Sequence, residues 1–254
     1  MGNKIPVIGT AIVNTPYWLY RMIMSVDYPT KEFVIFNNNG RGQITKEIDA
    51  LKDISHKYID KIKVCHLPAN IGCSGAWNMI IKCYMMESYW IISNHDLCFQ
   101  KGFLHKMVEA SADAETGIVN AGYNQWEIFL IKDWVIQEYG LFDENFYPAY
   151  AEDLDYLMRL LVKPVKQIHV GTGYLHGEED YSTSGSQTWR SDLSLKEKMD
   201  TSRYLNEHEY MTEKWGSEWR SLKPYENPFN LCNNPLSATK KYDLNFLRRK
   251  HTGF

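Results

Sequence analysis

The chain has little net charge and no long apolar run, and each of these two absences excludes a class of protein. A formal net charge of −3 over 254 residues creates no field that would attract nucleic acid or an anionic membrane surface. The apolar stretch from Met79 to Met86 is interrupted by Lys82 and falls short of the roughly 20 residues that span a bilayer. We therefore expect no nucleic-acid partner and no membrane span.

Cysteine is also scarce and scattered. The five cysteines form an odd set without CxxC spacing: Cys65, Cys73, Cys83, Cys98 and Cys232. This pattern suggests neither a disulfide framework nor a structural zinc site. The first residues lead into an apolar segment without the basic flank and cleavage site of a signal peptide. We expect a reducing compartment and a cytoplasmic location.

Short apolar runs alternate with amphipathic segments along most of the chain. Val7 to Val13 is β-branched and apolar, as in a strand buried on both faces, and Thr15-Pro16 then predicts a helix start. Further strands are expected at Phe33 to Phe36, Lys63 to Leu67, Tyr89 to Ile92 and Gln167 to Val170, and helices at Ile44 to Ile54, Ser74 to Met85 and Leu193 to Trp219. This alternation predicts an α/β sandwich with a largely parallel sheet, whose ligands bind beyond the carboxyl ends of the strands.

The regular alternation ends after His176. Gly177 to Gln187 is rich in Ser, Thr, Gly and acids, which favours a loop ordered by a ligand. Pro and Asn are dense from Lys223 to Ser237, and Lys240 to Lys250 is basic. We expect one domain over residues 1–222 and an extended tail over residues 223–254.

The first three strand exits carry small and amide-bearing residues. They are Thr10, Ala11, Ile12 and Asn14, then Asn37 and Asn38, then Asn70, Gly72, Ser74 and Gly75. Asparagine can pair with a pyrimidine edge or a ribose hydroxyl, and glycine allows the backbone to approach a ligand. Asn-Asn-Asn-Gly alone is more typical of a turn, but three such exits together favour a nucleoside pocket.

The fourth exit brings an acid directly after a buried strand, in the order Asn94-His95-Asp96. A carboxylate there could bind Mg²⁺ or Mn²⁺ between two phosphates. An isolated Asp more often caps a helix, here one starting near Gly102, or closes an Asx-turn. His176 follows the last expected strand, where a neutral imidazole could complete the metal site.

Three carboxylates, Glu152, Asp153 and Asp155, stand at the start of an amphipathic segment. Acids in a first helical turn are common because they complement the helix dipole. The functional interpretation makes Asp153 a base that removes a proton from an attacking hydroxyl. Glu152 or Asp155 would then orient the acceptor.

Taken together, the motifs resemble the GT-A glycosyltransferases, especially the family-2-like group, across roughly residues 5–177. The resemblance rests on Thr10 to Asn14, Asn37-Asn38, Asn70-Ile71-Gly72 with Asn78, Asp96, Phe142 to Phe146 with Glu152-Asp153, and His176. It implies a GT-A three-layer sandwich with a nucleotide half of about residues 1–97 and an acceptor half of about residues 98–222. Asn94 and His95 would join the nucleotide site, and Asp96 and His176 the metal site.

The order of motifs is closer still to the small glycosyltransferases encoded by chlorella viruses. That resemblance implies a UDP-sugar donor, Mn²⁺ dependence and transfer of rhamnose or glucose to a glycan acceptor, in the host cytoplasm. Two positions depart from the family: Asn37 stands where Asp is frequent, and Asn94 replaces the first Asp of the metal motif.

Two other functions remain open from the residues. A sugar nucleotidyltransferase would need a Gly-rich, Arg-containing loop after the first strand, and Ala11 to Asn14 has neither residue. A noncatalytic carbohydrate-binding module would use tryptophans such as Trp126 and Trp189 to stack on sugars. In the glycosyltransferase interpretation these two tryptophans flank the acceptor.

Overall fold

The computed structural model of the chain describes residues 4–40, 42, 44–177 and 186–230. Its centre is a seven-stranded sheet in the order β3-β2-β1-β4-β7-β6-β8. The strands are β1 Ile5–Ile12, β2 Thr30–Asn37, β3 Ile59–His66, β4 Tyr89–Asn94, β6 Thr116–Asn120, β7 Ile128–Lys132 and β8 Lys166–His169. Only β7 pairs antiparallel to its neighbours, so the sheet is mostly parallel, as the sequence predicts.

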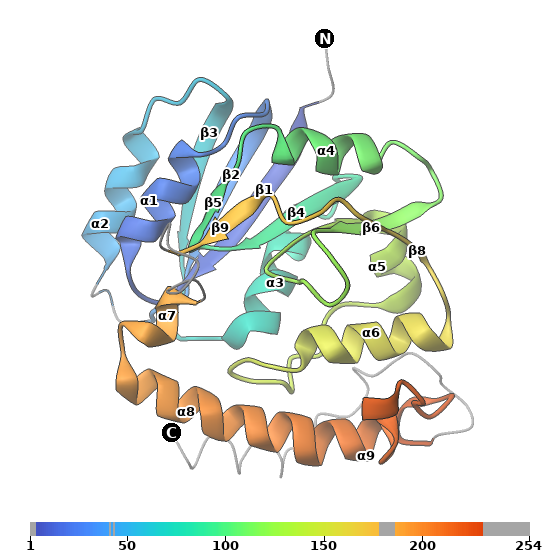
Figure 1. Cartoon of the computed structure of the whole chain (residues 1–254). Helices are drawn as coiled ribbons and strands as arrows, with labels where there is room; N and C mark the ends of the chain where they lie inside the picture. The colour runs from blue at the N-terminus through green and yellow to red at the C-terminus, as the bar shows by residue number, and fades with distance from the viewer. Residues whose placement is uncertain (1–3, 41, 43, 178–185, 231–254) are drawn as a thin grey trace.

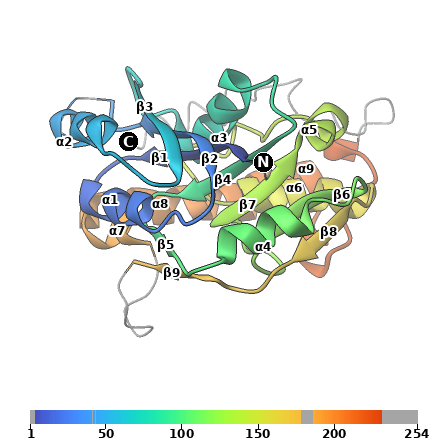
Figure 2. The same ribbon diagram turned by 90° about the horizontal axis from the view of Figure 1, so that it is seen from above.

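Helices cover both faces of this sheet (Figures 1 and 2). They are α1 Pro16–Met24, α2 Thr45–Asp49, η1 Ala50–Asp53, α3 Gly72–Cys83, α4 Phe103–Ala110, α5 Asp133–Tyr139 and α6 Glu152–Val162. Side chains alternate along β1, so Ile8 packs with α1 and α4 while Val7 packs with α3 and α5. Two apolar cores on opposite faces of one sheet form the expected three-layer sandwich.

The expected strands and helices are found, with changes at their ends. The helix expected over Ile44 to Ile54 is instead short α2 followed by the 3₁₀ turn η1. His176 is predicted at the exit after the strand Gln167 to Val170, and it is the last residue of a further short strand, β9 Tyr174–His176, which pairs antiparallel with β5 Leu97–Phe99. That pairing sets His176 opposite Leu97, the residue after Asp96.

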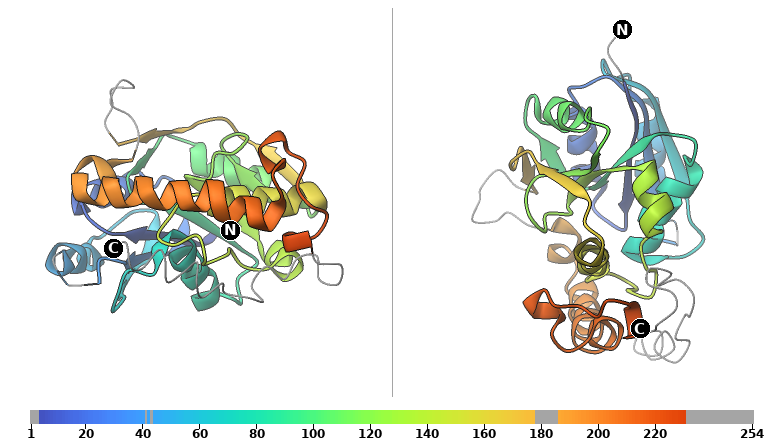
Figure 3. Two further views of the ribbon diagram at one scale, coloured as in Figure 1. Left: turned by 90° about the horizontal axis from the view of Figure 1, so that it is seen from below. Right: turned by 90° about the vertical axis from the view of Figure 1, so that its right-hand side faces the viewer.

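A helical arm follows the sandwich and crosses below the carboxyl-end edge of the sheet (Figures 1 and 3). It contains α7 Gln187–Arg190, α8 Leu193–Tyr204, the π-helical turn η2 Leu205–Tyr210 and α9 Met211–Trp215, then the short turns η3 Trp219–Ser221 and η4 Pro228–Asn230. The long helix expected over Leu193 to Trp219 is thus present from Leu193 to Trp215, widened in its middle, and Trp219 lies in the separate turn η3. Residues 178–185 of the expected loop and residues 231–254 of the expected tail, with Cys232 and the basic cluster, lie outside the described residues. No helix in the described part of the chain is long and apolar enough to cross a membrane.

Four charged side chains join the arm to α6 in the interior. Lys214 Nζ of α9 lies 2.7 Å from Asp143 Oδ2 and 2.6 Å from Asp155 Oδ1, while Arg159 pairs with Asp155 Oδ2 at 2.5 Å. Trp215 Nε1 also donates to Asp155 Oδ1 at 2.8 Å. Each of the four charged side chains is almost fully buried. This buried charge network holds two cations and two anions and therefore sums to zero.

Replacing Lys214 by Met should strongly destabilise the protein. The substitution leaves Asp143 and Asp155 with a single buried cation between them, and breaking a buried pair from one side costs about 3–5 kcal/mol. Urea unfolding followed by circular dichroism measures this change, with the exposed Lys198→Met on α8 as the matched control. A midpoint unchanged from wild type would show that the network carries no net stability.

Candidate active site

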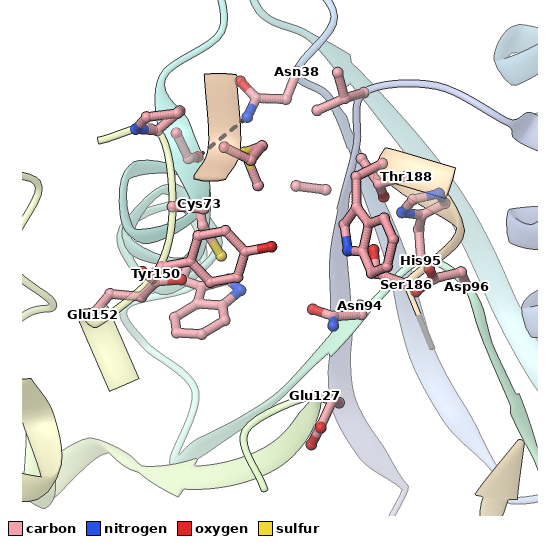
Figure 4. Close-up of a pocket in the computed structure, with 18 of the residues that line it drawn as sticks. Asn38, Cys73, Asn94, His95, Asp96, Glu127, Tyr150, Glu152, Ser186 and Thr188 are labelled. Atoms are coloured by element: carbon pink, nitrogen blue, oxygen red, sulfur yellow. Dashed lines mark hydrogen bonds between the residues drawn. The ribbon is translucent and has the colours of Figure 1, made fainter. Parts of the chain in front are cut away.

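A cavity of about 330 Å³ opens at the carboxyl edge of the sheet, between the sandwich and the arm. Figure 4 shows Cys73, Tyr150 and Glu152 on one wall and His95, Asp96, Ser186 and Thr188 on the other. The lining residues are Ala11, Val13, Asn38, Asn70, Gly72, Cys73, Trp77, Ser93, Asn94, His95, Asp96, Asn124, Trp126, Glu127, Pro148, Ala149, Tyr150, Glu152, Asp153, His176, Ser186, Thr188, Trp189, Leu195 and Met199. The two acidic motifs singled out from the sequence therefore share one cavity.

One wall carries a buried Asp–His pair. Asp96 is 2 % exposed, and its Oδ1 lies 3.2 Å from Nε2 of His176, while its Oδ2 accepts a hydrogen bond of 2.6 Å from the Gln187 amide. Burial opposes ionisation of Asp96, but contacts with His176, His95 and the Gln187 amide outweigh it and lower the pKa to about 2. Gly102 N–H instead bonds to Asp27, so the interpretation of Asp96 as a cap for that helix is wrong.

This pair has the geometry of two neighbouring metal ligands. Two adjacent ligands of an octahedral cation about 2.1 Å away lie about 3 Å apart, and Asp96 Oδ1 and His176 Nε2 have that spacing. Nε2 of His176 faces Asp96, which raises the pKa of the imidazole despite its burial, so a cation bound here would take the place of the imidazole proton. Within the described residues no three metal-binding side chains come together, so phosphate oxygens and water would supply the remaining ligands.

The opposite wall carries Glu152 and Asp153 in the first turn of α6. Burial raises the pKa of Asp153 to about 6, with a smaller contribution from the carboxylate of Glu127. Glu152 accepts a hydrogen bond from the Cys73 thiol, whose pKa is raised by burial and then by Glu152. Asp153 thus has the property of a base that is ionised at neutral pH but still holds a proton well.

The turn before α6 is strained. Tyr150 and Ala151 have φ angles of 76° and 70°, a left-handed conformation that costs residues other than glycine about 1–3 kcal/mol each. This turn presents Pro148, Ala149 and Tyr150 to the cavity immediately before Glu152 and Asp153. The direction of the two carboxylates therefore depends on a turn that other parts of the protein must hold.

The three consecutive asparagines mainly tie the strand exits together. Asn38 donates to Gly72 O and accepts from Ile71 N–H, Asn39 donates to Val13 O, and Asn37 contacts His66. Asn38 lines the cavity and Asn37 does not. Direct base recognition by the Asn37 side chain is therefore not supported, since its amide contacts protein groups.

Several other predicted residues lie behind the cavity wall that the described residues form. Thr10 and Ile12 point away because side chains alternate along β1, and Ala11 and Val13 face the cavity instead. Ser74 is buried and Gly75 packs against Ile71 in α3. Asn14 donates to Thr188 O at 2.7 Å and so holds α7 against the end of β1.

Asp155 does not reach the cavity, which corrects its predicted acceptor role. Its carboxylate is fully buried between Arg159, Lys214 and Trp215. Trp126 and Trp189 do line the cavity. Trp126 is also part of the core against Phe129, whereas Trp189 on α7 is less buried, with Arg190 and Lys196 over its ring.

Glu127 is a cavity residue that sequence reasoning missed. It lies below and between the two walls in Figure 4, and its Oε2 accepts a hydrogen bond from Tyr174 Oη at 3.3 Å. Its carboxylate acts on both His176 and Asp153, in each case favouring the protonated form. A sugar bound between the walls would meet this carboxylate, which accepts hydrogen bonds from hydroxyls.

The cavity is rich in acids and poor in cations. Asp96, Glu127, Glu152 and Asp153 line it, and no Lys or Arg is found among the described lining residues. A diphosphate would be repelled by this lining unless a cation accompanied it. The cavity is therefore suited to a nucleotide that binds together with a divalent metal ion.

A mostly parallel three-layer sandwich with an acidic cavity at the carboxyl edge of its sheet agrees with the GT-A fold. The sequence model of the family described as "Glycosyl transferase family 2" matches residues 13–150, more than half of the chain. The chain belongs to this family and is a glycosyltransferase that uses a nucleotide-sugar donor and an acceptor. No curated protein matches the chain. Family membership decides against both a nucleotidyltransferase and a noncatalytic sugar-binding module.

Proposed function

We propose that the protein transfers a sugar, with rhamnose or glucose as candidates, from a UDP-linked donor to a hydroxyl of a glycan acceptor, with Mn²⁺ or Mg²⁺ as cofactor. The observation that carries the proposal is the Asp96–His176 pair facing Glu152 and Asp153 across one cavity. This is the arrangement that a reaction with an anionic leaving group and a hydroxyl nucleophile requires.

Asp96 and His176 would hold the metal ion, which when bound would neutralise negative charge on the diphosphate. Asp96 is suited to this role because its low pKa keeps it ionised at every physiological pH. The nucleoside would lie towards Ala11, Val13, Asn38 and Asn70, where apolar and amide groups line the cavity. Asn94 and His95 would lie beside the diphosphate.

Asp153 would accept the proton of the attacking hydroxyl, and Glu152 would orient the acceptor. Both carboxylates belong to the same helical turn and line the cavity, and the raised pKa of Asp153 brings it close to the pH at which a base works best. Trp189, with Trp126 deeper in the cavity, would pack against the acceptor sugar. The proposed nucleotide half, about residues 1–97, and the proposed acceptor half, about residues 98–222, would both contribute to each wall, since Cys73 lies beside Glu152 and Thr188 lies beside Asp96.

The resemblance to the small glycosyltransferases of chlorella viruses extends this proposal to a viral glycan as acceptor. The order of motifs from Thr10 to His176 supports that extension. A glycan acceptor also agrees with an acidic, aromatic wall, because sugars offer hydroxyl donors and apolar ring faces.

Release of nucleoside diphosphate from a panel of UDP-, GDP-, dTDP- and CDP-sugars, with and without Mn²⁺, tests the proposal. Slow hydrolysis of a UDP-sugar that requires the metal is the expected result. Turnover of a GDP- or dTDP-sugar would overturn the donor assignment and leave the enzyme class intact. Turnover that EDTA does not reduce would overturn the role of Asp96 and His176.

A further inference from the structure

One continuous helix face of the arm meets both the cavity and the turn that precedes α6. Leu195, Met199, Ser202 and Asn206 follow one another at spacings of four, three and four residues, which places them on the same side of a helix. Leu195 and Met199 line the cavity. Ser202 and Asn206 are fully buried and lie against the strained turn that precedes α6.

These two side chains donate hydrogen bonds to backbone carbonyl groups of that turn. Asn206 Nδ2 lies 2.8 Å from both Ala149 O and Tyr150 O, and 3.3 Å from Phe146 O. Ser202 Oγ donates to Tyr147 O at 3.1 Å and approaches Ala149 O at 3.4 Å. From the other side, Cys73 N–H donates to Pro148 O at 2.7 Å. The turn is therefore held from two sides through its backbone.

The environment of Asn206 requires a donor at this position. Its amide nitrogen faces carbonyl oxygens, whereas its Oδ1 is buried without a hydrogen-bond partner among the described residues. The orientation follows from these acceptors, since the amide oxygen would be repelled by them. Asn206 also lies in the π-helical turn, and such wide turns redirect side chains and are frequent at functional sites.

From these contacts we infer that Ser202 and Asn206 are positioning residues, which hold the left-handed Tyr150–Ala151 turn and so aim the Asp153 carboxylate at the acceptor hydroxyl. The inference rests on the proposed role of Asp153. Neither side chain lines the cavity that the described residues form, so both act through the turn. The family match ends at residue 150, so Ser202 and Asn206 lie beyond the matched region, whereas Cys73 lies within it.

Steady-state kinetics of Asn206→Asp and Ser202→Ala, measured on the full chain, test this inference. Asn206→Asp keeps the side-chain shape and replaces the donor by an acceptor, and we expect kcat to fall about 10–100-fold while KM for the donor stays within about twofold. Ser202→Ala should show a smaller loss of the same kind. The neighbouring Thr201→Ala removes an exposed hydroxyl that donates to Glu197 O, and should match wild type.

Two further readouts separate positioning from general damage. Binding of UDP with Mn²⁺, measured by calorimetry, should be unchanged in Asn206→Asp, because Asp96 lies on the other wall with His176 beside it. Hydrogen exchange of residues 147–154 should be about tenfold faster, with no change in β1. A folded Asn206→Asp variant with wild-type kcat and exchange would overturn the inference, as would equal losses of kcat and UDP affinity.

Hydrogen exchange does not depend on turnover and therefore distinguishes two failures. If wild type hydrolyses no donor, the proposed function fails. Unchanged exchange of residues 147–154 in Asn206→Asp would then show separately that Asn206 does not hold the turn.

Discussion

Asp153→Asn should lower kcat about 10²–10⁴-fold, the usual contribution of a positioned general base. In wild type we expect kcat to rise as pH increases through about 6, because burial sets the pKa of Asp153 near that value and only the ionised form accepts a proton. The variant should lose this rise. Nucleotide release measured from pH 5 to pH 8 checks both results, and a variant that keeps the wild-type pH profile would remove Asp153 from the reaction.

The same substitution should stabilise the protein at neutral pH. The folded protein raises the pKa of Asp153 from an ordinary 3.8 to about 6. It therefore holds the proton more tightly than the unfolded chain, and stability is lost as pH rises between these two values. Asparagine removes this cost, which amounts to at most about 3 kcal/mol at pH 7. Asp155→Asn on the same helix provides the contrast, because it breaks contacts with Arg159 and Lys214 and should lower the unfolding midpoint.

Asp96→Asn should abolish metal-dependent turnover. The variant keeps the size of the side chain and removes the charge that would hold the cation beside His176. Metal ions contribute several kcal/mol of charge stabilisation to such reactions, so hydrolysis of the donor should fall about 10³-fold.

Calorimetry with UDP tests the same residue without turnover. Wild type should bind UDP much more tightly with Mn²⁺ than without it, and Asp96→Asn should bind equally weakly in both conditions. The exposed Asp113→Asn is the matched control, since Asp113 pairs with Lys166 on the surface. Tight binding of UDP by Asp96→Asn that still depends on Mn²⁺ would show that other residues hold the metal.

The parallel strands and their exits could be predicted from the sequence because local patterns encode them. Val7 to Val13 is apolar and β-branched, Pro16 begins α1, and Asp96 directly follows a buried strand. The sheet then brings distant exits together without further information from the sequence. Placing Asp96 and Asp153 in one cavity needed only this rule and the helix start at Glu152.

Glu127 cannot be found from the strand exits, because it stands before a strand and not after one. It precedes β7, which runs antiparallel to β4, so the start of β7 lies at the carboxyl edge of the parallel strands. The Asn94 N–H donates to Glu127 O at 2.7 Å and confirms that the two elements meet there. Strand direction in the second half of the sheet depends on long-range pairing, which no local pattern reveals.

Asp155 was assigned wrongly for a reason that helix geometry explains. Residues two apart on a helix point to opposite sides, so Asp153 and Asp155 cannot both face one cavity. Lys214, the partner of Asp155, is far away in sequence, and no local pattern predicts that this lysine is buried. The asparagines after β2 are a similar case. Their backbone partners, such as Gly72 O, come from other strand exits, so the sequence alone predicts ligand-binding groups where the structure has contacts within the protein.

The buried charge network also bears on the order in which the chain can fold during synthesis. Asp143, Asp155 and Arg159 emerge from the ribosome well before Lys214, and the three alone carry one uncompensated negative charge. Closing α6 onto the sandwich would bury that charge, which is costly without a partner. We therefore expect α6 to pack onto the sandwich only after the arm has been synthesised, whereas β1 to β4 can pair earlier. A nascent chain ending before Lys214 would hold a paired β1 to β4 beside an α6 that has not yet packed.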